Sequence, residues 1–190
     1  MGHLPIQNRD RAPKQSSNPT HGYPQIYKHD RNNGLAILVS AAIISVLVLV
    51  TLGGTVRVTE SGLGCPDWPL CHGSLIAPAG FHTWIEFSHR LVATVVAFFV
   101  FSATVFAYKV NRGPSHIRAA LLLASILVVV EILVGGLTVL TELPPATVTL
   151  HLGIAQLIFS SLILALVPLL LTRPTPLPVG SPLLLWATLS

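Results

Sequence analysis

The sequence predicts an all-α membrane protein: a polytopic four-helix bundle made of two repeated helical hairpins. Of its 190 residues, 52% are hydrophobic and 9% are charged, whereas a soluble domain carries about 25% charged residues. Four apolar runs are close to or above the ~20 residues that a helix needs to cross the hydrocarbon layer, and only a helix satisfies the backbone of such runs in lipid. The first and third runs end alike, and the second and fourth begin alike.

The elements follow in order along the chain. Residues 1–33 are polar and have no apolar core, so we expect a disordered cytoplasmic tail. They are not a signal peptide, because the apolar run begins too late and is too long. The expected spans are residues 35–56, 83–108, 117–140 and 147–171. They form a transmembrane domain over residues 34–172, with a loop at 58–82, and residues 173–190 are a tail or the start of a truncated fifth span.

Basic residues predict the orientation of these spans. The net charge is +4, and the basic residues gather in the tail, in the second connection (Lys109, Arg112 and Arg118) and after the fourth span (Arg173). Cytoplasmic ends of membrane helices are enriched in Lys and Arg. We therefore expect a multi-pass protein of the plasma membrane, with a cytoplasmic N-terminus and the loop at 58–82 outside. No aromatic residues are interleaved with the basic ones, as they would be in a protein that binds single-stranded nucleic acid.

Two histidines are the sharpest functional signal. The first and third runs each carry a Gly-Gly pair before similar residues, "GGTVRVTES" and "GGLTVLTEL", and the second and fourth carry His89 and His151 near their outer starts. Repeats in membrane proteins often place a ligand site at their interface, although Gly-Gly also simply permits close helix packing. Imidazole is an axial ligand of haem iron. His89 and His151 could hold one haem between them; the alternative is two unconnected interfacial histidines.

Three of the charged residues within the spans are candidates for a role at this site. Glu86, three residues before His89, shares its helix face. Ionising a carboxyl within the membrane costs about 2.5–3.5 kcal/mol on insertion scales, so we expect a partner, proton exchange or hydration there, unless Glu86 lies at the water edge. Arg90 could pair with a haem propionate or extend to the interface. Glu131, in mid-span, has no assigned role; lining a proton or polar path is one interpretation.

Four segments resemble the haem A synthase family: "GGTVRVTESGLGCPDWPLCHG", "EFSHR", "GGLTVLTELPP" and "TLHLGIAQ". The resemblance covers about residues 35–171. It implies oxidation of the C8 methyl group of haem O to a formyl group, by successive hydroxylations, to give haem A for cytochrome oxidase. Family members usually have eight spans in two four-helix halves, each with a histidine pair; one half is thought to hold the substrate haem and the other haem B. This chain matches the N-terminal half, so His89 and His151 would ligate haem iron and Glu86 would act near the reacting methyl.

The resemblance also implies partners. A second four-helix half, or a second copy of this chain, would complete the pair of halves, and an isolated half could be inactive. Haem O synthase and the assembly machinery of cytochrome oxidase are further partners that the resemblance suggests. Two alternatives remain: a non-catalytic cytochrome b-type electron carrier with two histidine ligands, and a structural or assembly subunit that binds no haem.

The loop at 58–82 holds both cysteines of the chain, Cys65 and Cys71. Because we expect this loop outside, where disulfides persist, we expect the two to form a disulfide. It would staple the loop, and a redox role stays open. Two cysteines without a second pair nearby make a zinc site a poor alternative.

Overall fold

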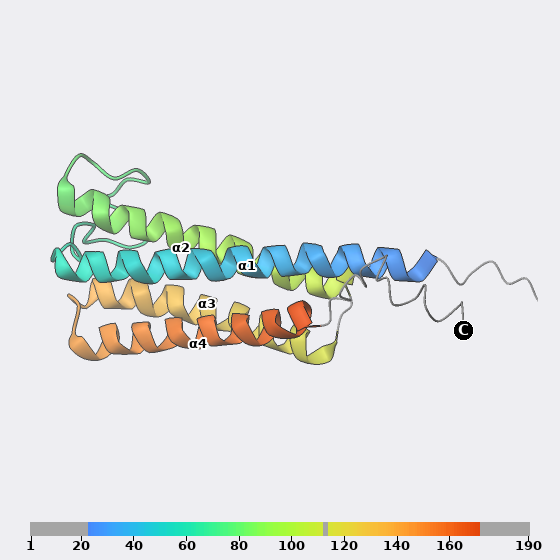
Figure 1. Ribbon diagram of the computed structural model, residues 1–190. Helices are drawn as coiled ribbons and strands as arrows, with labels where there is room; N and C mark the ends of the chain where they lie inside the picture. The colour runs from blue at the N-terminus through green and yellow to red at the C-terminus, as the bar shows by residue number, and fades with distance from the viewer. Residues whose placement is uncertain (1–22, 112–113, 172–190) are drawn as a thin grey trace, which may run out of the picture.

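The structure, a computed structural model, describes residues 23–111 and 114–171. The elements are α1 (Tyr23–Val58), α2 (Phe81–Phe106), a short π-helix η1 (Ala107–Asn111), α3 (Ser115–Leu140) and α4 (Pro145–Leu171) (Figure 1). Four helices are long and apolar enough to cross a membrane, and the described part of the chain contains no β-strand. The predicted all-α, multi-pass membrane fold is confirmed.

The helix ends differ from the predicted spans by a few residues, with one larger exception. α1 begins at Tyr23, so residues 23–33 of the predicted disordered tail are helical. These residues lack the apolar pattern from which a helix is predicted, so the extension could not be foreseen. Residues 1–22 and 172–190, which include most of that tail and the expected start of a fifth span, lie outside the described residues.

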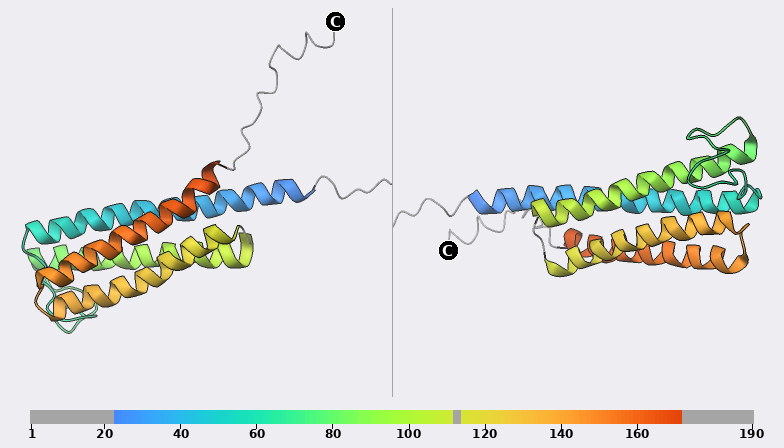
Figure 2. Two further views of the ribbon diagram at one scale, coloured as in Figure 1. Left: turned by 90° about the horizontal axis from the view of Figure 1, so that it is seen from below. Right: turned by 180° about the vertical axis from the view of Figure 1, so that it is seen from behind.

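The helices form two hairpins that pack against each other. α1 packs on α2 and α3 packs on α4, while α1 also contacts α4 and α2 contacts α3 (Figures 1 and 2). Among the described helices, the backbones of α2 and α4 do not approach each other closely, and neither do those of α1 and α3. α2 and α4 are therefore diagonal partners across the bundle axis. These are the two helices that carry His89 and His151.

The apolar core fills only part of the bundle. The connections at residues 59–80 and 141–144 are here called the loop end. The buried core residues that lie nearest to it on the four helices are Val46, Val96, Val128 and Ile154. Beyond that level the buried helix residues are small or polar: Glu86, Gly136 and Thr138. Protein interiors are normally packed to the density of organic crystals. The bundle thus loses its tight aliphatic core at the level of the two histidines.

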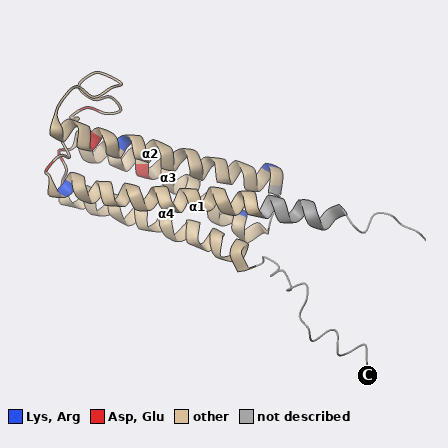
Figure 3. Cartoon of the chain, turned by 45° about the horizontal axis from the view of Figure 1, so that its top comes forward, with Lys and Arg blue, Asp and Glu red and all other residues tan. Residues whose placement is uncertain are grey.

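The charges are unevenly distributed along the bundle (Figure 3). From residue 33 onward, every acidic residue belongs to the loop end or to the helix segments next to it: Glu60, Asp67, Glu86, Glu131 and Glu142. Hydrophobic side chains cover most of the helix surface between the two ends, with exposed leucines or valines on all four helices and exposed phenylalanines on α2. Such a surface suits lipid rather than water. The polar chemistry of the described chain is concentrated at one end of the bundle.

Candidate functional site

Each histidine lies against a glycine of the other helix of its hairpin. A Cβ atom added at Gly53 of α1 would lie 3.3 Å from Nε2 of His89, and one added at Gly135 of α3 would lie 3.0 Å from Cε1 of His151. These are the first glycines of the two Gly-Gly pairs. The repeat in the sequence is therefore also a repeat in the structure. In each hairpin the absence of a glycine side chain lets the imidazole ring pack directly against the neighbouring helix.

The glycines beside the two histidines occupy equivalent positions in α1 and α3. Gly53 and Gly135 each precede the last residue of their helix by five positions, which places both about 7–8 Å below the helix end at 1.5 Å per residue. Both imidazoles are half-buried, and they are near enough to interact electrostatically. Neither ring nitrogen of His89 has a hydrogen-bond partner in the described part of the chain, and Nδ1 of His151 is buried without one. Two rings on diagonal helices can therefore approach a planar group from opposite sides.

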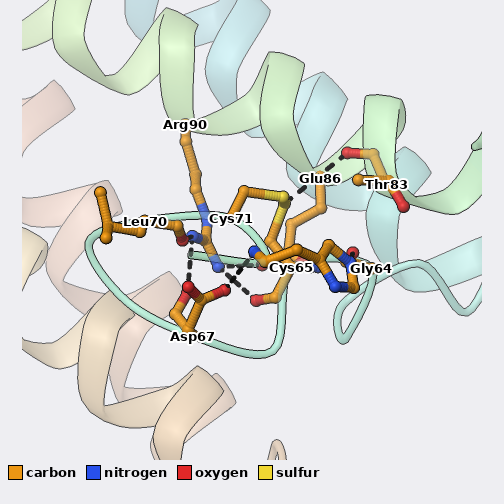
Figure 4. A network of polar contacts seen from close by, with 9 residues as sticks. Gly64, Cys65, Asp67, Leu70, Cys71, Thr83, Glu86 and Arg90 are labelled. Carbon is orange, nitrogen blue, oxygen red and sulfur yellow. Dashed lines mark hydrogen bonds and ion pairs between the residues drawn. A yellow bond between two sulfur atoms is a disulfide. The ribbon is translucent and has the colours of Figure 1, made fainter. Parts of the chain in front are cut away.

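Glu86 and Arg90 form a buried polar cluster between α2 and the loop (Figure 4). Glu86 is 3% exposed; its Oε2 accepts a hydrogen bond from the backbone N–H of Cys65 at 2.8 Å, and its Oε1 accepts one from Nη2 of Arg90. The Arg90 guanidinium also donates to three loop carbonyls, of Cys65, Asp67 and Leu70, at 2.7–2.9 Å. Its four terminal N–H groups are thus all used, which leaves Nε–H as the remaining donor. The expected contact of Arg90 with a haem propionate stays a prediction, while its contacts in the structure fix the loop.

The loop is braced from within as well. Cys65 and Cys71 form the predicted disulfide. The two carboxylate oxygens of Asp67 accept hydrogen bonds from the backbone N–H groups of His72 and Gly73, at 2.6 and 2.8 Å. These bonds, that of Gly73 above all, hold the pKa of Asp67 below its usual value. Asp67 was missed in the sequence because its partners are backbone groups, which no residue pattern displays.

The loop also joins the two hairpins. A Cβ atom at Gly136 of α3 would lie 2.7 Å from Cδ2 of Trp68, so the indole packs directly on the glycine backbone. Gly54, the equivalent residue in α1, has nothing within 4 Å of such an atom. The loop of the first hairpin therefore reaches over to the second. The sequence showed a small residue at position 136, but no pattern linked it to a tryptophan so far away in the chain.

Glu131 lies one helical turn before Gly135 and approaches His151. Its Oε1 is 3.3 Å from Nδ1 of His151, and its side chain is 13% exposed. The second oxygen, Oε2, is buried without a hydrogen bond. The residue to which the sequence assigned no role thus lies beside one of the two candidate haem ligands.

The chain is similar in sequence to known proteins. The sequence profile of the cytochrome oxidase assembly protein family, COX15-CtaA, matches residues 36–80 and 77–190. A protein named heme A synthase from Geobacillus thermodenitrificans is 36% identical over 129 residues, which cover 68% of this chain and 39% of the relative. Another heme A synthase, from Exiguobacterium sibiricum, is 33% identical over 135 residues, covering 70% of this chain and 46% of the relative.

A third relative carries a different name. A protein of Natronomonas pharaonis named protoheme IX farnesyltransferase 1 is 31% identical over 136 residues, which cover 72% of this chain and 28% of the relative. The chain spans less than half the length of each of these three curated relatives. Because the family profile matches nearly all of the sequence beyond residue 35, the chain belongs to the COX15-CtaA family of cytochrome oxidase assembly proteins.

Proposed function

We propose that this chain is the N-terminal, haem-binding half of a membrane oxidoreductase that converts the C8 methyl group of haem O to the formyl group of haem A. The observation that supports it best is the pair of histidines at one level on diagonal helices, each beside a glycine. The relatives named heme A synthase support the same activity. The reaction would serve the assembly of cytochrome oxidase, in keeping with the family description.

The residues present fit a haem. His89 and His151 would hold the haem iron through their imidazole nitrogens, and Gly53 and Gly135 keep side-chain atoms away from their rings. Because the buried aliphatic core ends at this level and the helix residues buried beyond it are small or polar, this end of the bundle is the part best suited to take up a large ring system. When bound, the iron supplies the redox chemistry; the haem is haem O as substrate, haem A as product or haem B as electron carrier.

Glu86 is the proposed catalytic residue, near the reacting methyl group. It precedes His89 by three residues on α2, so the two side chains share a face of the helix. Arg90 and the N–H of Cys65 hold its two carboxylate oxygens in place, so the carboxylate is oriented before any substrate arrives. Charge-assisted hydrogen bonds of this kind also offset the cost of burying a carboxylate.

An electron carrier is the competing function, and the loop argues against it. A cytochrome b-type bundle needs both histidines, but it has no use for a buried glutamate tied to a disulfide-braced loop. Here Glu86, Arg90 and Cys65 form one hydrogen-bonded unit over the candidate site. We therefore favour the enzyme.

Location and partners complete the proposal. A disulfide in the loop and basic residues such as Lys109 and Arg118 at the opposite end favour a loop outside the plasma membrane. A second four-helix half, or a second copy of this chain, would supply the other haem site. The relative named protoheme IX farnesyltransferase contains a segment similar to this chain, which supports a haem O synthase as the neighbouring enzyme.

The test is haem analysis of purified protein. The chain is expressed in membranes that contain haem O, alone and with the C-terminal half of a heme A synthase, and extracted haems are separated by chromatography. We expect the wild type to contain bound haem and the variants His89→Ala and His151→Ala to lose it. The variant Glu86→Gln should still bind haem but should form no hydroxylated or formyl product. Glu142→Gln, an exposed carboxylate of the short turn, is the matched control. A wild-type chain that binds no haem would refute the proposal, and full turnover in Glu86→Gln would refute the role of Glu86.

A further inference from the structure

The two hairpins share a scaffold but place their acidic residue differently. Glu86 of the first hairpin lies on the same helix as its histidine and is bound by Arg90 and the loop. In the second hairpin the residue three before His151 is Val148, and the acid is Glu131 on the preceding helix. The residue equivalent to Glu131 in the first hairpin is Leu49, four before Gly53. The acid beside His151 is therefore not part of the repeat.

The surroundings of Glu131 show that its carboxyl is directed at His151. Oε1 lies 3.3 Å from Nδ1 of the imidazole, which is close enough for a hydrogen bond, although the angle in this structure does not make one. Both Nδ1 and the other oxygen, Oε2, are buried and lack any hydrogen bond within the described residues. A carboxylate and an imidazole left unpaired in a membrane span are costly, so two such groups in contact indicate a hydrogen bond that a small rotation of either side chain would complete.

We propose that Glu131 is a positioning residue: its carboxylate accepts a hydrogen bond from Nδ1–H of His151 and so presents Nε2 of that ring to haem iron. This inference rests on the proposed haem site and deepens it. A ligating histidine commonly donates its second ring N–H to a carboxylate or carbonyl, which fixes the ring and raises its basicity. His89 has no such partner in the described chain, so the two axial ligands would be unequal, with His151 the stronger donor.

Two properties of the protein follow from this unequal ligation. A more basic axial imidazole stabilises ferric over ferrous iron, so removal of the carboxylate should shift the midpoint potential of the haem in the positive direction. Loss of a carboxylate partner of this kind typically weakens metal binding 10–100-fold, and we expect a similar loss of haem affinity. Before any haem binds, Glu131 should also hold His151 in the tautomer with the proton on Nδ1.

The experiment compares Glu131→Leu with Glu131→Gln in the full chain, purified in detergent micelles. Nitrogen-15 spectra of labelled histidine, assigned with a His151→Gln variant, report the tautomer in the haem-free protein. Added ferric protohaem then gives the affinity and the midpoint potential. Gln156→Leu removes an amide of similar size from an exposed position on α4 and is the matched control, and circular dichroism checks that every variant is helical.

We expect Glu131→Leu to move the His151 proton to Nε2, to weaken haem binding 10–100-fold and to raise the potential. Glu131→Gln, whose amide oxygen can still accept the hydrogen bond, should lie between Glu131→Leu and the wild type. If Glu131→Leu matches the wild type in tautomer, affinity and potential, the assignment of Glu131 is wrong while the haem site stands. A wild-type chain that takes up no protohaem would overturn the site itself, and this assignment with it.

Discussion

Replacement of Arg90 by leucine should release the loop from α2. The guanidinium donates two hydrogen bonds through each of Nη1 and Nη2, three of them to loop carbonyls and one to Glu86. Leucine keeps part of the apolar stem of the side chain but removes every donor. The loop carbonyls would lose their partner, and the Glu86 carboxylate would keep only the N–H of Cys65.

The structure sets the size of the effect. Four hydrogen bonds to a charged group at about 1.5–3 kcal/mol each would give an upper bound of about 6–12 kcal/mol. The Arg90 side chain is 18% exposed, so water replaces part of what is lost. The larger cost comes from Glu86, 4% exposed in its side chain, which is left as a buried charge without its cation; breaking such a pair costs about 3–5 kcal/mol. We expect a destabilisation in that range.

The assay is a double-mutant cycle on the haem-free protein. Unfolding of the wild type, Arg90→Leu, Glu86→Leu and the double variant is followed in detergent, with hydrogen exchange at the Cys65 amide as a local probe. The double variant should be more stable than the sum of the single effects predicts, by up to about 3 kcal/mol for groups in direct contact. Strict additivity would show that Arg90 and Glu86 do not interact. In a separate haem titration, an Arg90→Leu variant that loses haem affinity with its loop unchanged would show that the residue serves a haem propionate instead.

Three further predictions concern the loop. In a single-tryptophan background, Gly136→Ala should shift the emission of Trp68 to longer wavelength, because the new methyl would lie 2.7 Å from the indole, whereas Gly54→Ala, with open space around it, should change nothing. The folded-state pKa of Asp67 is held below its ordinary value of 3.8. The stabilisation that Asp67 gives the loop is therefore complete above pH 3.8 and is lost as the pH falls through the lower folded pKa. Trp68 emission should report this transition, and Asp67→Asn should abolish it. Cys71→Ser should lower the free energy of unfolding by about 2 kcal/mol from loop entropy alone, measured by denaturant titration.

The helices and the paired histidines could be predicted because their signals are local or repeated. A run of apolar residues long enough to cross a bilayer has one stable backbone conformation there, so the spans were placed to within a few residues. His89 and His151 stood out because each follows a Gly-Gly pair at a similar position in two similar hairpins. A repeat lets one half of a sequence corroborate the other, which a single motif cannot do.

The contacts of the loop could not be predicted, because they join side chains to backbone groups and to distant helices. Arg90 looked equally suited to a propionate or to the membrane interface, since a guanidinium binds any acceptor; the structure gives it loop carbonyls. Trp68 and Gly136 meet only after both hairpins are assembled. The helical start of α1 at Tyr23 was missed for the opposite reason, because a polar helix extending beyond the bundle has no apolar stripe to reveal it.

The difference between the hairpins explains why a repeated scaffold could hold one haem with two distinct sides. Gly53 and Gly135 provide the same space beside His89 and His151, so the repeat accounts for the symmetric part of the site. The charged groups around the two histidines depart from the repeat: the acid on α2, its arginine and the braced loop occur in the first hairpin alone, and Glu131 in the second alone. A carrier would need only the symmetric part. The asymmetric part, concentrated around Glu86, is what a catalyst that modifies one edge of a porphyrin requires, because only one edge of the ring can face it.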